Sequence, residues 1–261
     1  MILPKKSLGQ NFLIEKNIIK KIISLTDFKN KDILEIGPGK GALTDEILTK
    51  NPKSLVLIEK DFLLTQNLKK KYYAKKEVKI FNADILKFDF KKLKKKKLIV
   101  IGNLPYNISS QILIRIIKQK KIHIIFNDLI FMFQKELGEK ILCNFPSKNY
   151  GRLSIITRLN LIAKSNFIVS PNCFYPKPKV RSMVIHFKTF KNDFYKIKDV
   201  SNLEKVTNIL FSNRRKMINK SIKKILSHQN LKKIPELKLN LRAENIDPDL
   251  IYKITELFEK N

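Results

Sequence analysis

The chain has 261 residues, which suits one large or two modest domains, and its 43% hydrophobic and 30% charged residues exclude global disorder. Its most apolar stretch, residues 122–133, falls short of the roughly 20 apolar residues that a membrane span needs, which excludes a membrane protein. Its 54 Lys and Arg against 23 Asp and Glu give a formal net charge of +31, and such a surface predicts a polyanionic partner, most commonly nucleic acid.

The first 190 residues are predicted to form an α/β domain. Residues 1–31 indicate a basic segment followed by a helix, and from residue 32 short apolar runs alternate with longer amphipathic stretches. This alternation is typical of a parallel sheet with helices on both faces. The expected strands are residues 33–36, 55–58, 78–81, 98–101 and 129–133, with a later pair at 166–170 and 180–187. The expected helices are residues 42–50, 62–73, 108–119 and 135–143.

The pattern changes near residue 200. From about residue 201 it predicts helices alone, and it contains no further strand-like runs. These helices are expected at residues 201–212, 216–227 and 247–259. We place a boundary near residues 188–200 and expect a Rossmann-like domain, residues 1–190, followed by a small all-helical domain, residues 191–261.

A glycine-rich turn follows the first expected strand, because Gly37, Gly39 and Gly41 fall within five residues. Such a turn at the start of a helix lets backbone approach a ligand closely. The next strand ends at Glu59, whose carboxylate can accept from both hydroxyls of a ribose. The third is followed by Asp84, which is suited to an adenine amino group at the same sheet edge. An adenosine without phosphates fits this set best. S-adenosyl-L-methionine is therefore the leading candidate ligand, and NAD is a weaker one. The structural alternative is that Glu59 and Asp84 only cap helices.

The loop after the fourth strand, Asn103-Leu104-Pro105-Tyr106, is the most informative motif. A ligand of an open α/β sheet lies at the carboxyl ends of the strands, so this loop faces the glycine turn. Methyl transfer to the amino group of adenine needs a free lone pair on the nitrogen, but that lone pair is conjugated into the ring. Two acceptors that bind the amino hydrogens would favour a pyramidal nitrogen. The candidates are the Asn103 side-chain carbonyl and the Leu104 backbone carbonyl. Pro105 aims that backbone carbonyl, and Tyr106 offers a face for an extruded base. A plain proline turn is the alternative.

Other chemistry has little support in the sequence. Two cysteines, Cys143 and Cys173, and three scattered histidines form neither a disulfide framework nor a zinc motif, so no metal is expected. The N-terminal residues lack the apolar region of a signal peptide. We therefore expect a soluble, cytoplasmic protein, and we expect a monomer because no long exposed apolar stripe is evident.

The motif at residues 103–106 occurs together with Gly-Gln-Asn-Phe-Leu at 9–13 and Glu-Ile-Gly-Pro-Gly-Lys-Gly-Ala-Leu-Thr at 35–44. This ordered set resembles the ribosomal RNA adenine N6-dimethyltransferases, most closely their bacterial small-subunit branch, over nearly the whole chain. Further matching segments are residues 134–136, 150–154, 174–182 and 211–216. The resemblance implies dimethylation of N6 in two adjacent adenosines near the 3′ end of small-subunit (16S) rRNA, within an immature 30S particle, with S-adenosyl-L-methionine as the methyl donor.

The resemblance also implies roles for individual residues. For the cofactor it implies that Asn11 and Leu13 close over the methionine part, that Gly37 and Gly39 form the turn, and that Glu59 and Asp84 hold ribose and adenine. For the reaction it implies that Asn103 is shared between cofactor and target amine, and that Tyr106 and Phe174 sandwich the flipped adenine. For Phe174, packing of the proline-rich loop at 171–178 is the alternative.

Five basic residues are expected to contact RNA. Lys5 and Lys6 lie beside the N-terminal motif, and Arg214, Arg215 and Lys216 lie in the expected helical domain. Ordinary solvated charge is the alternative for both groups.

Two other functions remain open. One is methylation of a large-subunit rRNA adenine, as in the erythromycin-resistance branch, although Tyr106 rather than Phe after the proline argues against it. The other is a ribosome assembly factor that acts mainly by binding.

Overall fold

The computed structural model describes residues 4, 5 and 8–260. It divides into two compact units. The first unit contains the residues up to 116, 121–138 and 161–190, and the second contains 117–120, 139–160 and the residues from 191 onwards. The second unit thus also includes residues 139–160, which the sequence pattern places with the sheet.

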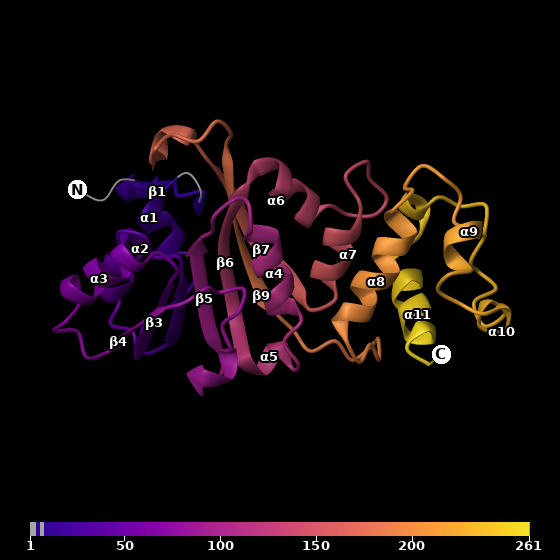
Figure 1. Ribbon diagram of the computed structural model, residues 1–261, viewed down its shortest axis with the longest axis horizontal. Helices are drawn as coiled ribbons and strands as arrows, with labels where there is room; N and C mark the ends of the chain where they lie inside the picture. Colours follow the sequence, from indigo (N-terminus) through magenta and orange to yellow (C-terminus); the bar gives the residue numbers. More distant parts are fainter. Residues whose placement is uncertain (1–3, 6–7, 261) are drawn as a thin grey trace. The chain divides into compact units, whose positions relative to one another are not determined.

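The first unit is built on a seven-stranded sheet with the order β4-β3-β2-β5-β6-β9-β7 (Figure 1). Strands β2 to β6 pair in parallel, whereas β9 is antiparallel to β6 and to β7. The strands are β2 (Asp32–Ile36), β3 (Ser54–Glu59), β4 (Val78–Asn82), β5 (Leu98–Asn103), β6 (Phe126–Gln134), β7 (Leu161–Val169) and β9 (Ser182–Thr189). A separate two-stranded sheet joins β1 (Phe12–Leu13) to β8 (Phe174–Tyr175). The expected α/β sheet is confirmed.

Both faces of the central strands are buried. Ile33, Leu55 and Ile99 share one face because they are register partners in β2, β3 and β5, and they belong to the main hydrophobic cluster. The alternate residues, such as Leu34 and Val100, are also fully buried. A strand buried on both faces has a continuous apolar sequence, which explains the apolar runs that identify these strands.

Helices α1, α2 and α3 lie together on one side of this sheet, as Figure 1 shows, and supply buried residues to the cluster. Each begins where its sequence supplies a suitable residue. For example, the Asp61 side chain accepts hydrogen bonds from the Leu63 and Leu64 amides at the start of α3. The helical segments that lie wholly or partly in the first unit are α1 (Lys16–Ile23), α2 (Ala42–Leu48), α3 (Phe62–Lys71), η2 (Phe90–Leu93), α4 (Ser109–Ile117), α5 (Ile122–Ile125), α6 (Lys135–Leu142) and η3 (Pro171–Cys173).

The second unit contains helical segments and no strand-built sheet among its described residues. They are α7 (Arg152–Arg158), α8 (Val200–Phe211), α9 (Asn219–Ile222), α10 (His228–Leu231), η4 (Ala243–Asn245) and α11 (Pro248–Phe258). Two buried tyrosines tie this unit together: the Tyr150 hydroxyl donates to the Ile246 carbonyl at 3.0 Å, and the Tyr252 hydroxyl donates to the Ile155 carbonyl at 2.6 Å. No helix in the described part of the chain is long and apolar enough to cross a membrane.

The expected helix at 216–227 is wrong, because only α9 within it forms an α-helix. Met217 bridges to Arg242, and the Ile218 amide donates to the Leu241 carbonyl, so this backbone pairs with a later segment instead of continuing α8. Helix α7 and the pairing of β1 with β8 are not predicted by the sequence pattern. Strand β7 begins five residues earlier than expected, at Leu161.

Candidate active site

A cavity of about 770 Å³ opens at the carboxyl ends of the parallel strands in the first unit. This edge is where ligands of open α/β sheets bind, and the volume falls within the range of small-molecule sites. Most of the residues predicted to bind cofactor or act in catalysis line it: Asn11, Leu13, Gly37, Gly39, Glu59, Asp84, Asn103, Leu104, Pro105 and Tyr106.

The glycine turn has the backbone geometry that only glycine adopts readily. Gly37, Gly39 and Gly41 have φ angles of +66°, +59° and +86°. A Cβ on Gly37 would meet no atom within 4 Å, whereas a Cβ on Gly41 would lie 2.3 Å from the hydroxyl oxygen of Tyr72. Gly37 therefore keeps backbone exposed to the cavity, and Gly41 makes room for packing between α2 and α3.

Glu59 ends β3 with a carboxylate that lines the cavity and is only 7% exposed. Its Oε2 accepts from the Gly39 amide at 3.2 Å, and its Oε1 accepts from the Asp61 amide at 2.8 Å. Burial raises the pKa of this carboxyl, and the amide hydrogen bonds oppose that rise. Each carboxylate oxygen has a second lone pair, so the group is suited to accept from two neighbouring hydroxyls.

Asp84 follows β4 and faces the same cavity. Its Oδ1 accepts from the Leu86 amide and its Oδ2 from the Lys60 ammonium, both at 2.9 Å. Partial burial raises the pKa of Asp84, but these two partners outweigh burial and hold the pKa below its ordinary value. The group is thus an anionic acceptor at neutral pH.

A second buried carboxyl lines the cavity and was assigned no role from the sequence. Glu35 in β2 is 1% exposed and accepts a 2.7 Å hydrogen bond from the Thr44 hydroxyl. Burial raises the pKa of Glu35 to about 8. At neutral pH this side chain is therefore mostly a neutral acid, which distinguishes it from Asp84.

The N-terminal segment lies against the loop at residues 103–106 (the catalytic loop of the sequence prediction) and against the glycine turn. The Asn103 side-chain amide donates to the Asn11 carbonyl at 2.7 Å. Leu13 pairs with Phe174 through β1 and β8, and a Cβ on Gly39 would lie 3.0 Å from the ring of Phe12. Residues distant in sequence thus meet around one cavity.

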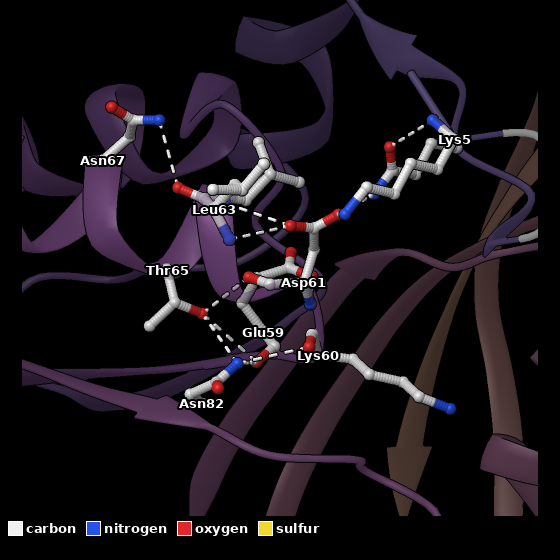
Figure 2. Close-up of polar contacts among 10 residues, drawn as sticks. Lys5, Glu59, Lys60, Asp61, Leu63, Thr65, Asn67 and Asn82 are labelled. Carbon is white, nitrogen blue, oxygen red and sulfur yellow. Dashed lines mark hydrogen bonds and ion pairs between the residues drawn. The ribbon is translucent and has the colours of Figure 1, made fainter. Parts of the chain in front are cut away.

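Asp61 does not line the cavity but holds Glu59 through its amide. The sequence analysis assigned it no role, although its position two residues after Glu59 at a helix start is a recognisable N-cap signal. Figure 2 shows its carboxylate between α3 and the N-terminal segment. One oxygen caps α3, and the other forms a 2.7 Å ion pair with the Lys5 ammonium and accepts from Gln10 at 3.4 Å. Lys5, predicted to contact RNA, therefore has a partner within its own chain.

Tyr106 borders the cavity, and its hydroxyl lies 2.6 Å from the Ser182 hydroxyl. The backbone carbonyl of Tyr106 accepts from the Ser109 hydroxyl at 3.2 Å. Both ends of this residue are therefore held by hydrogen bonds.

Phe174 does not join Tyr106 at the cavity. Its ring is 3% exposed, it belongs to the main hydrophobic cluster, and it is absent from the cavity lining. The geometry corresponds to the packing alternative, and the predicted base sandwich remains a prediction.

The basic residues of the second unit differ in their availability. The Arg214 guanidinium pairs with Glu244 at 2.8 Å and donates to the Lys148 carbonyl, whereas Arg215 and Lys216 are exposed. Lys6 lies outside the described residues.

Three residues of the cavity fit S-adenosyl-L-methionine. Glu59 and Asp84 present acceptors suited to a ribose diol and an adenine amino group, and the open space at Gly37 admits a ligand against the backbone. Within the described residues, no group of three or more His, Cys, Asp or Glu side chains is arranged to hold a metal ion.

Comparisons with known proteins agree with this geometry. Residues 2–260 match the family model described as ribosomal RNA adenine dimethylase. The chain is 45% identical to ribosomal RNA small subunit methyltransferase A of Pelagibacter ubique, over 98% of this chain and 97% of that protein. It is 41% identical to the protein of the same name from Buchnera aphidicola, over 99% and 94% of the two chains.

Two solved structures support the fold. A dimethyladenosine transferase from Plasmodium falciparum superposes with a TM-score of 0.78 at 25% identity, covering 95% of this chain and 98% of that one. The 23S rRNA methyltransferase ErmE, at 19% identity and a TM-score of 0.70 over 95% of this chain and 100% of that chain, shares the fold. Because the family model matches residues 2–260 and the relatives from Pelagibacter ubique and Buchnera aphidicola are 45% and 41% identical over nearly their full length, the chain belongs to the ribosomal RNA adenine dimethylase family.

Proposed function

We propose that this protein dimethylates N6 of two adjacent adenosines near the 3′ end of small-subunit (16S) rRNA, with S-adenosyl-L-methionine as methyl donor. The observation that carries the proposal is the position of Asn103 and Tyr106 on the same cavity as Gly37, Glu59 and Asp84. Similarity over almost the full chain to relatives named small subunit methyltransferase A supports the choice of rRNA.

The cofactor assignments follow from the donors and acceptors of the cavity. Glu59 accepts from the two ribose hydroxyls, and Asp84 accepts from the adenine amino group. Asn11 and Leu13 border the space for the methionine part. When bound, the cofactor supplies an electrophilic methyl group on a sulfonium.

The catalytic loop prepares the target nitrogen. The Asn103 amide nitrogen donates to Asn11, so the side-chain oxygen is the group that accepts from the target amine. The Leu104 carbonyl accepts the second amino hydrogen and thereby favours a pyramidal nitrogen with a localised lone pair. Tyr106 carries the extruded base on its ring face.

Proton transfer needs no dedicated base in this arrangement. When the N–C bond to the methyl group forms and the C–S bond breaks, the target nitrogen becomes a cation, which releases a proton to water. The monomethylated nitrogen still has a lone pair and one hydrogen, so a second round follows by the same route.

The partner that we propose is an immature 30S particle in the cytoplasm. A net charge of +31 favours a polyanion, and the exposed Arg215 and Lys216 are candidates for contact with its phosphates. We propose that residues 191–261 recognise the RNA while residues 1–190 bind cofactor and perform the transfer.

The test is methyl transfer from labelled S-adenosyl-L-methionine to immature small and large ribosomal subunits, with nucleosides identified by mass spectrometry. We expect N6,N6-dimethyladenosine in the small-subunit rRNA alone, and none with Asn103→Ala. Label on the large subunit would instead support the resistance-type reaction. Cofactor and particle binding without any transfer would support an assembly factor.

A further inference from the structure

A partly buried hydrogen bond joins the loop at residues 103–106 to a strand that carries no assigned site residue. The Tyr106 hydroxyl and the Ser182 hydroxyl are 2.6 Å apart, within the usual range for O–H···O bonds. Ser182 is fully buried, at 0% exposed. Burial raises the pKa of the Tyr106 phenol and the bond with Ser182 only partly offsets this, so the phenol is neutral at physiological pH.

The sheet fixes the position of Ser182. It lies in β9, where its register partners are Gln134 in β6 and Val169 in β7. The neighbouring Arg181 carbonyl accepts from the Lys135 amide at 2.9 Å. Because the backbone is paired on both sides, only the rotation of one short side chain remains to place the Ser182 oxygen.

The sheet order brings this serine to the catalytic loop. Strand β5 ends in Asn103 and pairs with β6, which in turn pairs with β9. The polar ends of Tyr106 are thus both attached: its carbonyl to Ser109, and its hydroxyl, across β6, to Ser182. A bond at the far end of the ring restricts the side chain about χ1. It also restricts the ring plane, because a phenolic O–H prefers to lie in that plane.

We propose that Ser182 is a positioning residue that fixes the ring of Tyr106 at the angle on which the target adenine stacks. The inference rests on the proposed function, since it assumes that Tyr106 carries the base. Ser182 itself borders no part of the cavity and acts only through Tyr106. Ser182 thereby limits the orientations that the bound base can adopt and favours the one in which the amine of the base faces Asn103.

The chemistry of the pair predicts a distinctive pattern among variants. Ser182→Ala leaves a partly buried phenolic oxygen without its partner, so the ring moves towards water or another polar group. Tyr106→Phe removes that phenol while keeping the ring, and its ring then depends on packing alone. In the double variant there is no unpaired phenol to draw the ring away, so adding Ser182→Ala to Tyr106→Phe causes little further loss.

The experiment measures kcat and the KM for immature small subunits, together with the affinity for S-adenosyl-L-methionine by calorimetry. We expect Ser182→Ala to lower kcat about tenfold or more, with cofactor affinity within about twofold of wild type. Ser182→Thr, which keeps the hydroxyl, restores most of kcat. The double variant matches Tyr106→Phe. Full activity of Ser182→Ala, or losses that simply multiply in the double variant, would overturn the proposal.

Two controls separate this role from general damage. Ser154 is also fully buried and bonds only within its own helix start, to Gly151, so Ser154→Ala removes a buried hydroxyl without touching Tyr106. We expect it to leave kcat unchanged. A kcat loss as large as that of Ser182→Ala, with a similar fall in thermal midpoint, would show a merely structural effect.

A spectroscopic measurement distinguishes failure of this inference from failure of the proposed function. With 3-fluorotyrosine incorporated, the ¹⁹F resonance that disappears in Tyr106→Phe identifies this side chain. That resonance must shift in Ser182→Ala and return towards its wild-type position in Ser182→Thr. An unchanged resonance refutes the pairing whatever the activity. If the resonance shifts in Ser182→Ala but the wild-type protein methylates no RNA, the pairing stands and the role in base stacking is refuted.

Discussion

The ammonium of Lys5 and the carboxylate of Asp61 form an ion pair of 2.7 Å that attaches the N-terminal segment to the start of α3, beside the cavity (Figure 2). Gln10 bonds the same carboxylate at 3.4 Å. The Asp61 amide in turn donates to Glu59, so one short stretch of chain supports both the Glu59 carboxylate and the segment that borders the cavity.

We expect Asp61→Asn to weaken cofactor binding by up to about fivefold, since an ion pair with a half-exposed lysine contributes about 1 kcal/mol at most. Asparagine still caps α3 by accepting from Leu63 and Leu64, so the thermal midpoint changes little. Lys5→Gln should show the same loss, and the two changes together no more than either alone. Calorimetry at low and high salt measures this, and an affinity that neither variant alters would contradict it.

The same variants test the predicted RNA contact of Lys5. If its charge also neutralises a phosphate, Lys5→Gln lowers the slope of RNA affinity against salt concentration by about one. Asp61→Asn leaves the lysine charge in place and should not lower that slope. We expect a difference between the variants only in this measurement. Equal slopes would leave Lys5 with the structural role alone.

Glu59 and Glu35 offer a matched pair of substitutions in one cavity. In Glu59→Gln an amide hydrogen must face the backbone amide of Gly39 or of Asp61, each of which donates to the wild-type carboxylate. We expect cofactor affinity to fall about 10- to 100-fold, as for loss of hydrogen bonds to a charged group, while RNA affinity is unchanged. Glu35→Gln resembles the neutral acid present at pH 7 and keeps the Thr44 bond, so its affinity stays within about twofold.

Glu35 also predicts a pH dependence of stability. Its folded-state pKa of about 8 is raised from an ordinary value of 4.5. Between these values the folded state retains a proton that the unfolded state has lost, so the free energy of unfolding falls as pH rises through this window. Glu35→Gln removes this contribution. Denaturation midpoints across the window should therefore fall less steeply for the variant than for wild type, and parallel curves would refute the assignment.

The glycines of the turn should separate stability from cofactor binding. Gly41→Ala puts a Cβ 2.3 Å from the Tyr72 hydroxyl at a φ of +86°, so we expect a cost of about 2 kcal/mol or more in stability. Tyr72→Phe removes the obstructing oxygen, and the two changes together should cost less than their sum. Gly37→Ala meets open space, so its cost is smaller in stability and larger in cofactor affinity. Thermal midpoints and calorimetry distinguish the two positions.

Sequence reasoning predicts which strand-end residues form the site, because one topological rule fixes where they lie. Parallel strands end at one edge, so Glu59, Asp84 and Asn103, each at or just after a strand end, must meet there. Apolar runs identify those strands because burial on both faces requires such runs. The position of the cavity follows from these two arguments without any knowledge of side-chain packing.

The segments and contacts that surround these residues could not be predicted in the same way. Strands β1 and β8 are two residues each and have no periodicity to detect. The bonds between Lys5 and Asp61 and between Tyr106 and Ser182 join positions far apart in sequence, and nothing local marks either member as a partner. The helix expected at 216–227 fails because tertiary pairing of Met217 with Arg242 overrides local helix propensity.

For Phe174, the family resemblance and the structure disagree. The resemblance to the family implies that its ring faces the flipped adenine, but here the ring is buried in the main hydrophobic cluster, to which its strand partner Leu13 also belongs. A base can stack on the ring only if the ring becomes exposed from this cluster. The comparison of Phe174→Leu with Tyr106→Leu decides between stacking and packing, because leucine fills much of the ring's volume but has no flat face.

From this geometry we expect Phe174→Leu to lower the thermal midpoint by a few degrees and to leave kcat within about threefold of wild type, whereas Tyr106→Leu lowers kcat more than tenfold. Phe174→Ala opens a cavity in the core and should cost about 3–5 kcal/mol. Thermal unfolding and single-turnover methyl transfer on the same preparations measure both quantities. If Phe174→Leu instead lost activity at an unchanged midpoint, the ring would have to leave the core when RNA binds.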